Sequence, residues 1–166
     1  MTILPDILAP NLDIVFCGTA VGNVSAQRGA YYAGPGNMFW PTLHAVGLTP
    51  RRLQPEQFRE VRSFGLGLTD LVKAVSGVDT QLSDHDFDRE RLHATILRYE
   101  PKILAFTSKR AGSEFLDRPV AYGLQSEKVG STALFVLPSP SGAARRWWDV
   151  GQWYELARLR EQMSLL

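Results

Sequence analysis

Two glycine- and serine-rich segments contain residue types that could bind a planar base and a phosphate group. The first covers residues 18–36 and ends in a pair of adjacent aromatic residues, Tyr31 and Tyr32, among glycines. An exposed aromatic ring in such a loop offers a face on which a nucleobase stacks. The alternative is that both rings fold back into a small secondary core. The sequence leaves these two interpretations open.

The second segment covers residues 138–146, with serines, prolines and Gly142 followed by the basic pair Arg145 and Arg146. Serine hydroxyls and main-chain amides can hold phosphate oxygens, and arginine adds positive charge. The alternative is an ordinary proline-containing turn followed by a solvated basic pair. We expect the two tryptophans that come next, Trp147 and Trp148, to pack against the body of the protein.

Both segments directly follow apolar runs that are typical of buried strands. Strands are expected over 12–17, 64–72, 102–107 and 133–137. Helices are expected over 37–46, 55–62, 89–99, 108–116 and 149–163, and a polar linker over 79–88. This alternation predicts one α/β domain over 1–166, with three α/β/α layers around a central, mostly parallel four-stranded sheet. Ligands of such sheets bind at the carboxyl ends of the strands, where both segments should lie.

Composition excludes several classes of protein. The chain has 166 residues, of which 45% are hydrophobic and 21% charged, which excludes a disordered chain. The single cysteine, Cys17, excludes an internal disulfide, a cysteine-rich zinc site and a cysteine-ligated iron–sulfur cluster. We expect no membrane span, no signal peptide and a cytoplasmic location, at the nucleoid if the protein is bacterial. Residues 1–88 hold six Lys/Arg against nine Asp/Glu, whereas residues 89–166 hold twelve against eight, a mild basic tilt.

Four ordered blocks of sequence resemble the mismatch-specific uracil/thymine DNA glycosylases of the uracil-DNA glycosylase superfamily. The blocks are GTAVGNVSAQRGAYYAGPGNMFW (18–40), GLTPR (47–51), GLGLTDLV (65–72) and LPSPSGAAR (137–145). They extend the resemblance over about residues 12 to 149, and the block that ends in Asn37-Met38-Phe39-Trp40 is the strongest.

The resemblance implies a uracil-DNA glycosylase fold and hydrolysis of the bond between a flipped-out base and deoxyribose, without metal or cofactor. The partner that the resemblance implies is DNA that contains uracil or an abasic site. The residues implied in base binding are Thr19 and Ala20 (main-chain amides), Tyr32 (stacking) and Asn37. Those implied in DNA binding are Ser139, Ser141, Gly142, Ala143, Arg145 and Arg146. The family's wedge position falls on Ala143, which is too small to fill the space of a flipped base, so Arg145 or Arg146 takes that role or the duplex is held less tightly.

The chain departs from the family where a water-positioning asparagine is usual. The family pattern Gly-x-Asn-Pro-Gly is replaced by Gly-Thr-Ala-Val-Gly over 18–22, and Ala20 cannot hold a water molecule. The reaction still needs a group that orients or deprotonates water. As the replacement for the asparagine we rank Asp70 first, Asn23 second and Ser25 third. The alternative role for Asp70 is that of a helix cap. No lysine is expected at the reaction centre, which argues against a Schiff-base lyase step.

Three functions follow from these residues. The first is a monofunctional, monomeric glycosylase acting on uracil, or also on other deaminated bases such as hypoxanthine or xanthine. The second is a protein that binds uracil or abasic sites in DNA with weak or no catalysis, because Ala20 has replaced the asparagine. The third is a hydrolase or transferase acting on free nucleotides.

Overall fold

Four buried parallel strands form the centre of the computed structural model, which describes residues 2–77 and 87–165. The strands are β1 (Ile14–Ala20), β2 (Leu66–Val72), β3 (Ile103–Phe106) and β5 (Thr132–Val136). Their order across the sheet is β2-β1-β3-β5, and every neighbouring pair is parallel. Strands covered on both faces are apolar at most positions, which is why nearly continuous apolar runs predicted them correctly.

A fifth strand corrects the predicted count of four. Strand β4 (Gly123–Val129) pairs antiparallel with β5 at the edge of the sheet. Its side chains alternate between exposed and half-buried, and its sequence, GLQSEKV, is largely polar. A strand with one wet face has no apolar run, and charged side chains on an edge strand also discourage pairing with other chains.

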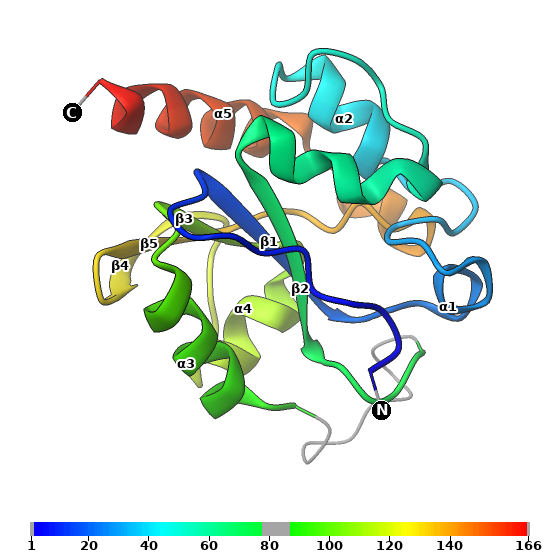
Figure 1. The fold of residues 1–166 in the computed structure, drawn as a ribbon, viewed down its shortest axis with the longest axis horizontal. Helices are drawn as coiled ribbons and strands as arrows, with labels where there is room; N and C mark the ends of the chain where they lie inside the picture. Colours follow the sequence, from blue (N-terminus) through cyan, green and yellow to red (C-terminus); the bar gives the residue numbers. More distant parts are fainter. Residues whose placement is uncertain (1, 78–86, 166) are drawn as a thin grey trace.

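Helices cover both faces of the sheet and confirm the three-layer α/β/α prediction (Figure 1). One layer holds α2 (Phe39–Ala45), the 3₁₀ helix η1 (Pro55–Phe64) and α5 (Val150–Ser164); the other holds α3 (Arg89–Tyr99) and α4 (Lys109–Leu116). Alternate residues of β1 enter the two cores. Phe16 stacks on Trp153 of α5, with ring centroids 6.0 Å apart, whereas Cys17 belongs to the core formed with α3 and α4.

Local capping explains why three helices begin where the sequence predicted. The side chains of Asp88, Ser108 and Asp149 accept main-chain N–H groups in the first turns of α3, α4 and α5, at 3.0, 3.0 and 2.9 Å. The helix expected from residue 55 is a 3₁₀ helix instead. Of the polar linker expected over 79–88, residues 79–86 lie outside the described residues.

The loop expected over 18–36 is shorter than predicted. Strand β1 continues to Ala20, and a short helix, α1 (Asn23–Arg28), follows. Gly22 precedes this helix in an extended conformation, and Gly29 ends it with a φ of 67°, which a residue with a side chain rarely adopts. Two of the glycines that indicated an open loop are therefore helix boundaries. Over residues 2–77 and 87–165, no helix is long and apolar enough to cross a membrane.

Candidate active site

Two loops from distant parts of the chain lie against each other at the carboxyl ends of the parallel strands. The N–H of Met38, two residues after the first segment, donates to the carbonyl of Pro140, in the second, at 2.8 Å. A Cβ atom added at Gly142 would lie 2.6 Å from the carbonyl oxygen of Pro35, so only glycine permits this approach. The two segments singled out in the sequence thus border one site.

Asp70 lies on β2, the outermost parallel strand, near the carboxyl ends of the strands. Asp70 is 3% exposed, and in the sheet it lies directly opposite Gly18 of β1. A Cβ atom added at Gly18 would lie 3.0 Å from Asp70 Oδ1, 3.5 Å from Thr107 Oγ1 and 3.5 Å from the hydroxyl of Tyr32. Because glycine has no side chain, a carboxylate and two hydroxyls converge over the β1 backbone.

Burial gives the Asp70 carboxyl an unusual affinity for protons. Loss of hydration raises the pKa of Asp70 from 3.8 to about 6, an effect partly offset by the positive charges of Lys73 and Arg91. A carboxylate with this pKa is mostly ionised at neutral pH and is a stronger base than an exposed aspartate. Such a group suits general-base catalysis.

Asp70 belongs to a network of charged and polar groups. Lys73 Nζ lies 3.4 Å from Asp70 Oδ2, 2.9 Å from Asp6 Oδ1 and 3.0 Å from the hydroxyl of Tyr31. Arg91 donates a hydrogen bond to the main-chain carbonyl of Asp70. The expectation that no lysine lies near the proposed centre is therefore wrong. Lys73 contacts the carboxylate through Oδ2, whereas Oδ1 is the oxygen near Gly18, so we assign Lys73 to positioning.

Four groups around Asp70 were missed in the sequence. Lys73 follows Asp70 by three residues, but residues three apart along a strand point to opposite faces, so this spacing gave no signal. The other three groups, Asp6, Arg91 and Thr107, come from distant segments. Asp6 accepts a hydrogen bond from the hydroxyl of Thr69, which lies 63 residues further along the chain. Arg91 lies 21 residues after Asp70. Only the strand order brings them together, and no local pattern marks them.

The two adjacent tyrosines have different roles. Tyr31 is 2% exposed and packs edge-on against Phe58, with ring centroids 5.4 Å apart. Tyr32 is half-buried at the site; its ring stacks on Phe39 at 3.9 Å, and its hydroxyl is 3.1 Å from Thr107 Oγ1. Burial, together with the charge of Asp70, raises the pKa of Tyr32, so its hydroxyl stays protonated. Tyr31 thus folds back into the core, as one of the two interpretations expected, whereas stacking of a base on Tyr32 stays a prediction.

The other two candidates for the catalytic group have structural partners. Asn23 is exposed at the start of α1, where its Oδ1 accepts a hydrogen bond from Ser76 Oγ at 3.2 Å. Ser25 is buried, and its Oγ accepts the N–H of Ala33 at 2.9 Å, which fastens the loop that carries Tyr32. Neither belongs to the group of side chains that converges at Gly18.

Three residues proposed to bind the base lie around the same edge. Thr19 and Ala20 are the last two residues of β1, and Ala20 is in register with Val72. Asn37 Oδ1 accepts the N–H of Phe39 at 2.9 Å. Asn37 therefore fixes the start of α2 and, through it, the aromatic ring on which Tyr32 stacks.

The second loop is rigid through its own serines and ends in an exposed basic turn. Ser139 Oγ accepts the N–H of Ser141, and Ser141 Oγ accepts the N–H of Ala143, each at 3.2 Å. The 3₁₀ helix η4 (Gly142–Trp147) follows. Its residues Ala143, Arg145 and Arg146 are exposed.

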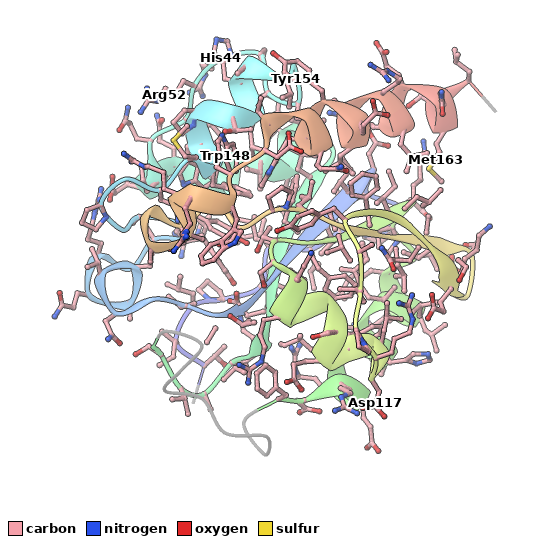
Figure 2. The ribbon with its side chains drawn as sticks, turned by 180° about the vertical axis from the view of Figure 1, so that it is seen from behind. His44, Arg52, Asp117, Trp148, Tyr154 and Met163 are labelled. Atoms are coloured by element: carbon pink, nitrogen blue, oxygen red, sulfur yellow. The ribbon has the colours of Figure 1, made fainter. Side chains whose placement is uncertain are left out.

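The two tryptophans after this turn differ from each other. Trp148 packs against the core as expected, with its ring centroid 5.7 Å from that of Trp153 (Figure 2). The expectation for Trp147 is wrong, because it is 61% exposed. Adjacent residues in a turn point in different directions, so one anchored ring leaves the other in solvent.

The site offers a carboxylate base, a half-buried aromatic ring, two hydroxyls and an exposed basic arm. Among residues 2–77 and 87–165, no three His, Cys, Asp or Glu side chains gather as metal ligands would. This set suits recognition of a planar, polar group attached to a phosphate-bearing chain, and proton transfer beside it.

Comparison with known proteins identifies the family. The sequence profile of the uracil DNA glycosylase superfamily matches residues 5–161, and the chain belongs to this superfamily. Its fold is similar to the solution NMR structure of a protein from Methanosarcina acetivorans described as a candidate uracil DNA glycosylase. The TM-score is 0.65 at 20% sequence identity, over 95% of this chain and 96% of that one.

Proposed function

We propose that this chain is a monofunctional DNA glycosylase that flips uracil out of DNA and hydrolyses its N-glycosidic bond, leaving an abasic site. The observation that carries the proposal is the buried carboxylate of Asp70, with Oδ1 at the point where Gly18 opens the β1 backbone. Within the superfamily, the motifs favour the mismatch-specific uracil/thymine group. Asp70 then supplies the function that the missing asparagine at Ala20 has in that group.

In the proposed reaction, Asp70 activates the water. Asp70 Oδ1 accepts a proton from a water molecule as its oxygen attacks C1′ of the deoxyribose. The C1′–N bond breaks, and its electron pair leaves with the base. The carboxylate charge also stabilises the positive charge that develops on the sugar. Lys73 and Arg91 hold Asp70 in position and do not touch the substrate.

The first loop binds the departing base. The ring of Tyr32, supported from behind by Phe39, stacks on the flipped base. Main-chain amides around Thr19 and Ala20 donate to the negative charge that the base acquires as it leaves. Arg145 and Arg146 contact phosphates beside the lesion. The enzyme acts as a monomer in the cytoplasm.

A base-release assay tests this function. The protein is incubated with labelled oligonucleotides that carry one uracil, either single-stranded or paired with G or A, and abasic sites are then cleaved with alkali. We expect strand cleavage only after alkali. Cleavage without alkali would show a lyase step, for which Lys73 is the first candidate. Binding without base release would instead support the second function, a lesion-binding protein in which Ala20 marks a lost activity. Preferential binding of free nucleotides would contradict both.

The rate of base release should rise with pH through about 6. Only the ionised form of Asp70 accepts a proton, and its pKa of about 6 makes the rate fall about tenfold for each pH unit below that value. Asp6, Lys73 and Arg91 share its surroundings, so removal of any one of them should move this midpoint. Single-turnover rates between pH 5 and 8 provide the measurement. A rate that stays constant from pH 5 to 7 would remove Asp70 as the base.

Tyr32→Ala should lower kcat/KM about tenfold, since stacking of a base on an aromatic ring contributes about 1–3 kcal/mol. Tyr32→Phe keeps the ring and loses only the contact with Thr107, so it should remain within about threefold of the unmodified protein. Thermal unfolding of both variants separates this effect from damage to the packing on Phe39. Equal activity of the two variants would mean that the ring does not stack on the base.

A further inference from the structure

The most exposed aromatic ring in the described part of the chain lies beside the candidate active site. Trp147 is 61% exposed, compared with 46% for Tyr154, the next most exposed aromatic residue there. Single exposed apolar residues are common on protein surfaces, so the position of Trp147 and the charges around it decide what this ring can bind.

The backbone that carries this ring is anchored by its neighbours. The N–H of Trp148 donates to the carbonyl of Arg145 at 3.1 Å, which closes the last turn of η4. Trp148 itself packs on Trp153 in the core. The first turn of η4 is capped by Ser141. Trp147 is thus held outward on an anchored turn, which limits the entropy that binding would cost.

The turn that carries Trp147 borders the proposed base pocket. Gly142, at its start, packs against Pro35 and Gly36, the residues that link Tyr32 to Asn37. The guanidinium of Arg145 reaches the same place, 2.9 Å from where a Cβ atom of Gly36 would lie. The start of η4 therefore lies beside the loop that carries Tyr32.

The charges around Trp147 fit a nucleic acid. Arg145 and Arg146 are exposed, and neither forms a salt bridge with any residue in 2–77 or 87–165. The guanidinium of Arg146 lies 5.1 Å from the centre of the Trp147 ring. Arginines without an ion pair bind phosphates, and an aromatic ring beside them stacks on bases.

We propose that Trp147 enters the base stack of duplex DNA and fills the space left by the flipped nucleotide, while Arg145 and Arg146 hold the flanking phosphates. This rests on the proposed glycosylase function. The side chain that enters the stack is then four positions beyond Ala143. The methyl group of Ala143 cannot fill the space of a flipped nucleotide. Apolar side chains inserted between base steps are an established means of holding DNA kinked and unstacked.

Three variants test the proposal. Trp147→Ala removes the ring, Trp147→Phe keeps a smaller one, and Tyr154→Ala is the matched control, because it removes an exposed ring from α5. The probe is a duplex with one tetrahydrofuran abasic analogue, together with the same duplex without it. We expect Trp147→Ala to bind the abasic duplex at least tenfold more weakly, Trp147→Phe to lose less, and Tyr154→Ala to bind as the unmodified protein does.

Two further measurements keep this test separate from the test of the enzyme. The ratio of base-release rates on duplex and single-stranded uracil should fall about tenfold in Trp147→Ala, since only the duplex has a stack to fill. The abasic duplex should quench tryptophan fluorescence in the unmodified protein, and this quenching should be lost in Trp147→Phe. Weaker abasic binding without base release in any variant would uphold the wedge and reject the glycosylase.

The opposite result rejects the wedge alone. If Trp147→Ala binds the abasic duplex normally and keeps the duplex to single-strand ratio, while the protein still releases base, Trp147 does not enter DNA. Its exposed ring would then belong to a surface for a protein partner.

Discussion

Asp70→Asn should release uracil about 10²–10⁴-fold more slowly than the unmodified protein, the contribution typical of a positioned general base. Asparagine has the size and shape of aspartate but cannot accept the proton of the attacking water. It also removes the negative charge that stabilises the cationic sugar. Single-turnover kinetics on a single-stranded uracil oligonucleotide give the measurement.

The same change should not destabilise the protein. The pKa of Asp70 is raised from 3.8 to about 6, so the folded chain binds this proton more tightly than the unfolded chain does. Stability therefore falls as the pH rises from about 4 to about 6, and ionised Asp70 costs about 3 kcal/mol above that range. Asparagine has no such cost, and Lys73 keeps its ion pair with Asp6. At pH 7.5 the free energy of unfolding should be equal or higher.

Asp117→Asn is the matched control. Asp117 is exposed at the end of α4, on the far side of the molecule from α5 (Figure 2), with a φ of 56° that asparagine tolerates well. This variant should keep full activity. If Asp70→Asn released base as fast as Asp117→Asn, the carboxylate would not be the catalytic group, and Asn23 would become the first candidate.

The fold could be predicted from the sequence wherever the pattern of apolar residues was typical of one kind of secondary structure. Apolar runs predicted the parallel strands because both faces of each strand are buried, and caps such as Ser108 fixed the helix starts. Strand β4 could not be predicted in this way, because its alternating polar sequence is also typical of a surface loop. Its pairing with β5 is a tertiary interaction that overrides local preference.

The loops of the candidate site could be predicted from the sequence, but most of the charged residues around Asp70 could not. Tyr32 and the second loop stood out because aromatic, glycine and serine residues are unusual together after a buried strand. Asp70 was identified through chemistry, since the replacement of asparagine by Ala20 required another polar group at the same edge. Burial shifts its pKa most, and two of the charges that add to this shift or oppose it, Asp6 and Arg91, come from distant segments. Trp147 was misplaced because exposure of an apolar ring contradicts the usual rule for burial.

Gly18 now has a physical role that its motif alone did not define. It is the point in β1 that lies beside Asp70 in the neighbouring strand, and its missing side chain leaves room for the carboxylate. A residue with a side chain at this position would compete with Asp70 Oδ1 for the same space. The proposed position of the Asp70 carboxylate therefore depends on a glycine whose φ is unexceptional and whose role is steric.

Gly18→Ala should lower the rate of base release about a hundredfold, with little loss of stability. The new Cβ atom would lie 3.0 Å from Asp70 Oδ1 and 3.5 Å from Thr107 Oγ1 and the Tyr32 hydroxyl, so the carboxylate must shift. Misplacement of a reacting group by about 1 Å can lower a rate about a hundredfold. The effect should appear in kcat on single-stranded uracil, while binding of the abasic duplex changes little.

Gly22→Ala is the control within the same motif. A Cβ atom added at Gly22 meets nothing within 4 Å, and its φ of −65° suits alanine. We expect it to retain activity within a few fold, so that the contrast isolates the space above β1 from any general effect of losing a glycine. Equal losses in both variants would mean that loop flexibility, and not the position of Asp70, limits the reaction. Loss in Gly18→Ala alone, with the pH midpoint near 6 moved in the same variant, would locate the chemistry at the Asp70 carboxylate.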